Sequence, residues 1–412
     1  MSLDASVYAR LDAALADVDV QLAADYPGER GDRQPVHTVY VPADRFTATL
    51  PGEWGTLAVA ALDALLPDAP ALAELLDVET SLAAEVLPRV RTKLSTEPIE
   101  DLRVDFEDGY GRRPDAEEDE AARLAAGALA AATLAYCGIR FKSLEPATRR
   151  RGIHTLDLFL DGLLAAGPLR NGFVVTLPKV THVGQVRAFT QLCSALEESH
   201  SLSPGMLRFE IQIETPQAIL AADGTAAVAR MVHSGDGRIT GLHFGTYDYS
   251  AACGVASPYQ SLDHAVADHA KAVMQLAASG TGVRLSDGSI NVLPVGSATQ
   301  IRAAWQLHAR LVRRSLERAY YQGWDLHPLQ LVTRYAATYA FYREGMPDAC
   351  DRLRTYFERA ESGVLDEPAT VKGMAALLTR GLQCGALDSA EVAERSGLAI
   401  SELEALHRRQ LR

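Results

Sequence analysis

Residues 207–248, LRFEIQIETPQAILAADGTAAVARMVHSGDGRITGLHFGTYD, contain the pattern that decides the fold. Two short runs rich in β-branched and aromatic residues, Leu207–Ile213 and Ile239–Phe244, flank a longer helical pattern, Pro216–His233. A strand, a helix and a strand at this spacing are typical of a βαβ unit, in which the two strands are parallel. This stretch therefore predicts a parallel sheet whose connecting helices cover it.

The same alternation continues on both sides of this stretch. Further strand candidates are His37–Pro42, Leu102–Phe106, Gly138–Phe141 and Phe173–Leu177, with weaker ones at Gly282–Leu285 and Trp324–Leu326. Helical patterns separate them at Asp115–Ala135, His182–Glu198, Asp263–Ala278 and Ala298–Gln322. Eight strand candidates favour a closed α/β barrel, the (β/α)8 TIM barrel. A doubly wound open sheet is the alternative, but no G-x-G-x-x-G pattern follows the first strand.

The length of 412 residues fits one large barrel with helical additions, since such barrels routinely exceed about 200 residues. We expect a catalytic barrel over residues 1–330 and a helical extension over 331–412 that serves as a lid or in oligomerisation. Residues 44–100 are long for one connection and include a helical pattern at Pro70–Lys93, so we expect an insertion near the barrel mouth.

Composition and charge exclude several classes of function. The net charge of -13 argues against a nucleic-acid partner, because such proteins present a basic face to the phosphates. The two short helices expected within Ser389–Leu411 imitate a helix-turn-helix, but Glu402 and Glu404 would repel DNA. Five widely spaced cysteines without a C-x-x-C pattern favour a reducing cytoplasm. Neither a signal peptide nor a run of about 18 apolar residues is present, so no membrane span is expected.

Acidic residues follow three of the predicted strands. Glu107 and Asp108 follow the second strand, Glu214 follows the fifth, and Asp248 follows the sixth. The carboxyl ends of barrel strands surround one pocket, so these side chains are expected to converge. Clustered carboxylates repel one another unless a cation holds them, and Mg²⁺ needs only one or two of them. Alternatively, each acid caps the helix that follows it, but three strand ends together favour a shared metal.

Basic residues occupy the strands between these acids. Arg140 and Lys142 flank Phe141, so alternation along the strand would point both to one face. Lys179 follows the fourth strand. A guanidinium beside a metal ion suits a 2-oxo acid or an enolate, because both charges can stabilise its oxygens. The alternative for Arg140 is an internal ion pair with Glu107 or Asp108.

The chain resembles the HpcH/HpaI aldolases and citrate lyase beta-subunit-like enzymes from about His37 to about Leu378. Six motifs in the same order carry this resemblance. They are Val39–Arg45 (VYVPADR), Asp105–Asp108 (DFED), Leu177–Val180 (LPKV), Ile213–Thr215 (IET), Gly245–Asp248 (GTYD) and Leu326–Gln330 (LHPLQ). The resemblance implies a (β/α)8 barrel and cleavage or formation of a carbon–carbon bond next to a carbonyl. It also implies a homo-oligomer, a trimer or a hexamer.

The resemblance also assigns roles to particular residues. Glu214 and Asp248 would hold Mg²⁺, or Mn²⁺ in its place, and Arg140 would stabilise an enolate oxygen. Residues 363–368 (GVLDEP) are similar to a late motif of malyl-CoA lyase-like members, in which the aspartate serves an adjacent subunit. Asp366 would then be a catalytic acid or base, although an N-cap of the next helix is its other interpretation. Glu107, Asp108, Lys142 and Lys179 are expected to bind or orient the substrate.

The departures from the family pattern leave the substrate open. Lys142 stands where the family has asparagine, and no coenzyme A pocket can be located in the sequence. A 2-oxo or 2-hydroxy (di)carboxylic acid, free or as its acyl-CoA thioester, is therefore the expected substrate. Phosphoenolpyruvate-type phosphoryl chemistry, with Lys142 at the phosphate, is a second hypothesis. A non-catalytic metabolite-binding protein is a third, and the set of Glu214, Asp248 and Arg140 argues against it.

Overall fold

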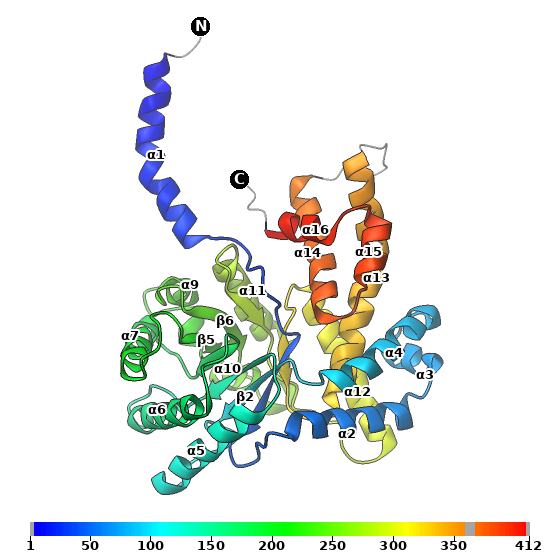
Figure 1. Ribbon diagram of the computed structural model, residues 1–412, viewed down its shortest axis with the longest axis horizontal. Coiled ribbons are helices and arrows are strands. Elements are labelled where there is room, and N and C mark those ends of the chain that lie inside the picture. Colours follow the sequence, from blue (N-terminus) through cyan, green and yellow to red (C-terminus); the bar gives the residue numbers. More distant parts are fainter. Residues whose placement is uncertain (1–3, 359–366, 409–412) are drawn as a thin grey trace.

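The computed structural model describes residues 4–358 and 367–408, and eight parallel strands form its centre (Figure 1). The strands are β1 (His37–Pro42), β2 (Asp101–Asp105), β3 (Tyr136–Arg140), β4 (Phe173–Leu177), β5 (Arg208–Ile213), β6 (Ile239–Phe244), β7 (Arg284–Ser286) and β8 (Gly323–Asp325). Each strand from β2 to β6 pairs with both of its neighbours in sequence, β7 pairs with β6, and β1 also pairs with β8. A parallel bridge from Ser286 to Gln322 closes the remaining gap. The predicted (β/α)8 barrel is confirmed.

Helices cover the outside of the barrel. They are α5 (Asp115–Ala131), α6 (Arg149–Ala166), α7 (Val183–Ser199), α8 (Pro216–Ile219), α9 (Ala227–Val232), α10 (Thr246–Ala252), α11 (Ala265–Ala278), α12 (Ala298–Glu317) and the first part of α13 (Gln330–Glu358). Capping boxes fix two of their starts, with His182 and Gln185 at α7 and Ser297 and Gln300 at α12. The single helix predicted over Pro216–His233 is wrong, because it is broken into α8 and α9.

Alternation along the strands sorts the side chains. Residues that face the helices are apolar and fully buried, for example Val104 on β2 and Ile211 on β5. Residues that face the barrel interior are largely polar, and several of them contact Glu210 on β5. Its carboxylate accepts hydrogen bonds from Tyr40 of β1, Arg103 of β2 and Thr176 of β4, and it contacts His243 of β6. The barrel is therefore tied across its centre by hydrogen bonds, while its apolar core lies between strands and helices.

The segment between β1 and β2 folds into α2 (Leu50–Leu65), α3 (Ala69–Leu76) and α4 (Thr80–Thr96). It begins at the carboxyl end of β1, but α4 packs against α13 and leads back to the amino end of β2. The expectation that this insertion lies near the mouth therefore holds only for its beginning. Among the described residues no single helix is long and apolar enough to cross a membrane, and only α2 and α3 taken together as a bent pair reach that hydropathy.

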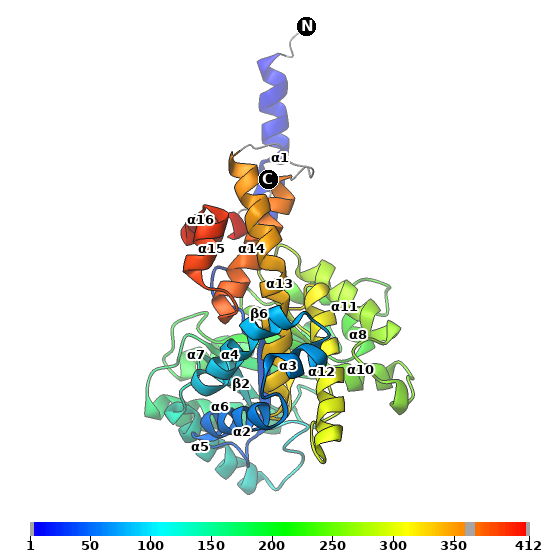
Figure 2. The same ribbon diagram turned by 90° about the vertical axis from the view of Figure 1, so that its right-hand side faces the viewer.

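The helical extension lies at the amino-terminal end of the barrel. Helix α13 runs past the barrel, and α14 (Pro368–Cys384), α15 (Ser389–Ser396) and α16 (Ile400–Arg408) gather around its far half (Figure 2). Gly397, in the left-handed region at a φ of 74°, ends α15, so the predicted pair of short helices is confirmed. Within one chain the described part of the extension lies away from the barrel mouth, and its expected role as a lid or in oligomerisation stays a prediction.

Candidate active site

A cavity of about 440 Å³ opens at the carboxyl ends of the strands. Residues of five strands and of the segments that follow six of the strands line it. They are Tyr40, Pro42, Arg45, Asp105, Asp108, Gly109, Arg140, Gln212, Glu214, Gly245, Thr246, Tyr247, Asp248, Ser289, Trp324 and Leu326. The structure therefore brings together Asp108, Arg140, Glu214 and Asp248, which the sequence placed at four different strand ends. This is the end of the fold where (β/α)8 enzymes carry their active sites.

Arg140 is held rigidly at the base of this cavity. It ends β3 opposite Asp105 of β2, and its Nε and Nη2 donate to the two Asp105 oxygens at 2.7 and 2.8 Å. Its guanidinium carbon lies 4.8 Å from the centre of the Tyr40 ring and 5.9 Å from that of Trp324. The contacts of Nη1, to Gln212 at 3.4 Å and Glu107 at 3.7 Å, are long. The carboxylate of Asp105 keeps the pKa of Arg140 raised despite burial, so a permanent cation faces the cavity.

Glu214 is a buried carboxylate beside this cation. One of its oxygens accepts the backbone N–H of Lys179 at 2.6 Å, and the other accepts from Nε2 of Gln212 at 2.9 Å. Burial raises its pKa to about 8, with part of the Arg140 and Lys179 attraction offset by Glu107 and Asp248. A nearby cation would stabilise the charged form of this carboxyl group and lower its pKa.

Lys179 places its ammonium among the acidic side chains. Its Nζ forms ion pairs with Asp248, with Asp108 at 3.0 Å and with Glu107 at 3.6 Å. Burial lowers its pKa, but the carboxylates around it more than offset this, so the pKa is raised and the charge is kept. Its backbone φ of 53° lies in the left-handed region, which is uncommon for a residue with a side chain. Such strain is concentrated at functional sites.

Glu107 and Asp108 form a coupled pair at the rim. Burial and the neighbouring Asp108 raise the pKa of Glu107 to about 7. The pKa of Asp108 is lowered although burial acts in the other direction, because Glu107 and Lys179 stabilise its charged form. Both residues therefore lie where the sequence placed them, close to Arg140 and Lys179, and they could orient a ligand of the cavity.

The acidic residues fit a magnesium ion. Glu214 and Asp248 line one cavity. The Lys179 ammonium pairs with Asp248, whereas Glu214 contacts only the backbone N–H of this residue. In the described part of the chain no group of three or more His, Cys, Asp or Glu side chains could enclose a metal. Magnesium needs no such cage, since it keeps several waters and accepts one or two carboxylates.

Lys142 does not line the cavity. Strand β3 ends at Arg140, so the alternation that would have aimed both side chains at one face stops there. The Lys142 ammonium instead donates to Glu118 of α5 at 2.7 Å and to the carbonyl oxygens of Phe106 and Gly111. Lys142 therefore stabilises the fold and does not reach the cavity. The phosphoryl hypothesis, which placed Lys142 at the phosphate of the substrate, loses its support. Asp366 lies outside the described residues.

Sequence reasoning missed three residues of the site: Asp105, Tyr40 and Trp324. Asp105 precedes the quoted acids by two positions and faces Arg140 in the strand register, so pairing β2 with β3 would have identified it. It replaces Glu107 and Asp108 as the main ion-pair partner of Arg140. Tyr40 and Trp324 are aromatic residues of β1 and β8, and only the pairing of these two strands brings both rings to Arg140.

The family model described as "Domain of unknown function (DUF6986)" matches residues 15–411. The chain belongs to this family. No curated protein matches the DUF6986 chain. Among solved structures it is similar to malate synthase of Haloferax volcanii at 3 mM glyoxylate, with 16% identity, a TM-score of 0.51 and coverage of 92% of this chain and 99% of that one. The lead(II) complex of that enzyme gives 17% identity, a TM-score of 0.51 and coverages of 91% and 99%.

A citrate lyase beta subunit from M. tuberculosis, complexed with oxaloacetate and magnesium, has 18% identity and a TM-score of 0.44 over 75% of this chain and 98% of that one. At these identities the comparisons concern the fold, and the fold comparison rests on malate synthase. The fold that the sequence resemblance implied is therefore confirmed for this DUF6986 chain.

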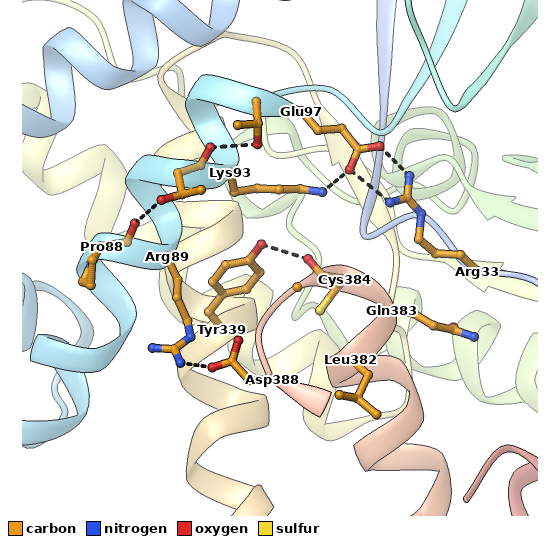
Figure 3. Close-up of a pocket in the computed structure, with 13 residues that line it drawn as sticks. Arg33, Pro88, Arg89, Lys93, Glu97, Tyr339, Leu382, Gln383, Cys384 and Asp388 are labelled. Atoms are coloured by element: carbon orange, nitrogen blue, oxygen red, sulfur yellow. Dashed lines mark hydrogen bonds and ion pairs between the residues drawn. The ribbon is translucent and has the colours of Figure 1, made fainter. Parts of the chain in front are cut away.

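A second cavity of the DUF6986 chain, of about 480 Å³, lies at the other end of the barrel between α4, α13 and the turn after α14 (Figure 3). Its charged side chains are paired with one another. Arg33 and Lys93 both bind Glu97, and Arg89 binds Asp388. The amino-terminal face of a (β/α)8 barrel is usually devoted to stability. Although this cavity is the larger one, its neutralised lining makes the barrel mouth the candidate active site.

Proposed function

We propose that this chain is a magnesium-dependent enzyme that forms or breaks a carbon–carbon bond next to the carbonyl group of a 2-oxo or 2-hydroxy acid, free or as its acyl-CoA thioester. One observation carries the proposal. The guanidinium of Arg140 is fixed by Asp105 over the cavity that Glu214 and Asp248 also line. A cation fixed in advance beside an acidic metal-binding pair suits a reaction in which negative charge develops on a substrate oxygen.

Each residue has a role in this reaction. Nη1 of Arg140, whose protein contacts are long, donates to the oxygen on which enolate charge develops. Glu214 and Asp248 would hold Mg²⁺, which when bound supplies Lewis-acid polarisation of the carbonyl group. Asp105 keeps the guanidinium in place, and the Tyr40 and Trp324 rings pack against it. Because Arg140, Asp105 and Glu214 are buried, little reorganisation is needed when charge appears.

The acidic substrate class has two supports. Arg45 and Arg140 line the cavity, and Nη1 of Arg140 makes only long contacts to the protein, so it can donate to a substrate carboxylate. Malate synthase, which shares the fold, was solved at 3 mM glyoxylate, a small 2-oxo acid. The acid or base of the reaction is Asp366 in this proposal, acting from an adjacent subunit.

The test is a magnesium-dependent screen of 2-hydroxy acids and acyl-CoA thioesters for released pyruvate, glyoxylate or acetyl-CoA. We expect product with at least one substrate. Arg140→Lys keeps the charge but loses the pair of hydrogen bonds to Asp105, so it should lower kcat on the order of 10²-fold. Arg150→Lys, a change of the same kind on the exposed surface of α6, is the control. Equal activity of Arg140→Lys and wild type would contradict the proposal, as would a phosphate-dependent activity without these products.

A further inference from the structure

Helix α1 (Ala5–Asp25) projects from the molecule, and an ion pair from its last residue, Asp25, to His233 at 3.8 Å ties its end to the barrel. Figures 1 and 2 show it extending away from the barrel in both views, and none of its residues is buried. Six large apolar side chains are exposed along it; Val20, 71% exposed, lies off the line of the other five, whose exposed fractions are between 46% and 55%. These five residues, named here the α1 seam, are Tyr8, Leu11, Leu15, Val18 and Leu22. An apolar stripe of this kind on a projecting element marks an interaction surface.

The spacing of the α1 seam specifies the type of partner. Its residues follow one another at intervals of three, four, three and four, which is the a and d pattern of a coiled coil. A helix of 21 residues spans about 30 Å, and in proteins most of the stability of a helix comes from packing of its apolar face. A helix with such a seam is stabilised by a second helix that packs its own a and d residues into the same grooves.

We propose that the α1 seam pairs in parallel with the α1 seam of a second copy of this chain. A second copy carries the same seam, so the two seams have the same period and the same length. The charges select the orientation, because Asp12 and Asp19 border one edge of the seam and Ala14 and Gln21 border the other. In a parallel pair each acidic edge faces the uncharged edge of the partner helix. In an antiparallel pair the acidic edges would face each other and repel.

The charge of α1 also disfavours other occupants. The helix carries four aspartates, Asp12, Asp17, Asp19 and Asp25, against the single Arg10. Helices that lie on anionic membranes or bind nucleic acid carry lysine and arginine on their polar faces. A partner of either kind would be repelled, whereas the neutral edge of a second seam would not.

The first experiment measures the mass of the full-length chain by sedimentation velocity over a range of concentrations. Leu11→Asp with Leu15→Asp places two charges in the seam and should weaken self-association at least tenfold. The control, Ala13→Asp with Ala16→Asp, adds the same charges to the opposite face and should behave as wild type. A monomeric wild type would overturn the proposal, as would unchanged association of the seam variant.

The second experiment tests the orientation and separates α1 from contacts made by the barrel. A parallel pair places the two Leu11 positions opposite each other, so Leu11→Cys in a Cys253→Ser background should form a disulfide-linked dimer under mild oxidation. Ala13→Cys in the same background should not, because Ala13 points away from the seam. If both variants stay unlinked, the seam does not pair in parallel and the proposal fails. Neither experiment depends on catalytic activity.

Discussion

At the scale of single residues, the site consists of charges that are fixed before any ligand arrives. Both carboxylate oxygens of Asp105 accept hydrogen bonds from Arg140, and the same oxygens accept the backbone N–H groups of Glu107 and Gly109. One carboxylate thus orders both the guanidinium and the loop after β2. Removing it would leave a buried positive charge without its partner, which is among the most costly changes in a protein interior.

Asp105→Asn should therefore lower the free energy of unfolding by about 3 kcal/mol, because breaking one side of a buried ion pair costs about 3 to 5 kcal/mol. Asp108→Asn, at a side chain 57% exposed, should cost less than about 1 kcal/mol. Urea unfolding of both variants and wild type measures the difference. Equal losses in the two variants would show that Asp105 has no special part in holding Arg140.

The raised pKa of Glu214 gives metal binding a pH dependence. Burial raises this pKa to about 8, so at pH 7 the carboxyl group is largely protonated and a metal ion must displace the proton. We expect the apparent Mg²⁺ affinity to be highest above pH 8 and to fall about tenfold per pH unit below it. Calorimetric titration from pH 6 to pH 9 measures this. A constant affinity over that range would mean that Glu214 does not titrate with the metal.

At the scale of elements, the turn from β6 into α10 holds the site together. A Cβ atom on Gly245 would lie 2.4 Å from the Cβ of Glu214, so only glycine allows the two segments to approach this closely. The turn therefore sets the position of one carboxylate and, three residues later, presents Asp248. This dependence on backbone packing can be tested without changing either proposed ligand.

Gly245→Ala should push Glu214 aside and weaken Mg²⁺ binding by about tenfold or more, a loss in the range that follows from misplacing a ligand. Gly373→Ala in α14 is the control, because nothing lies within 4 Å of the added atom. It should leave metal binding unchanged and stabilise the helix by about 0.5 to 1 kcal/mol. If Gly245→Ala binds Mg²⁺ as wild type does, the position of Glu214 is not set by this turn.

Elements with strong local signals were predictable from the sequence, and those that depend on tertiary contacts were not. Strands β1, β4 and β6 have the predicted bounds because their runs of apolar and β-branched residues end at Pro42, Pro178 and Gly245. The break between α8 and α9 was not predicted, because it depends on the turn at Asp223 and Gly224, which brings Leu220 and Ala226 together as a β-bridge. The acids and Arg140 were found at their strand ends. Lys142 was misplaced because its partner, Glu118, lies on a helix that sequence alone cannot position.

At the scale of the whole molecule, the two ends of the barrel have different roles. The carboxyl end carries the candidate active site, while the amino end is joined to the helical extension by hydrogen bonds such as that from Tyr339 to the Cys384 carbonyl at 2.8 Å. Arg343 of α13 adds ion pairs to Glu85 of α4 and Glu391 of α15. Disturbing the amino end should therefore change stability without changing the site.

Tyr339→Phe should lower the free energy of unfolding by about 1 kcal/mol, the usual contribution of one buried hydrogen bond. It should leave the Mg²⁺ affinity within error of wild type. Unfolding and calorimetry on the same preparation provide both values. A matching loss of Mg²⁺ affinity would show that the extension and the active site are coupled.

The proposed chemistry requires that Glu214 and Asp248 bind the same divalent ion beside Arg140. Electron paramagnetic resonance of bound Mn²⁺ tests it directly by counting ions. We predict one ion per chain in wild type, an affinity at least about tenfold weaker in both Glu214→Gln and Asp248→Asn, and retained binding in Arg140→Lys. Wild-type affinity for Mn²⁺ in both carboxylate variants would contradict the account.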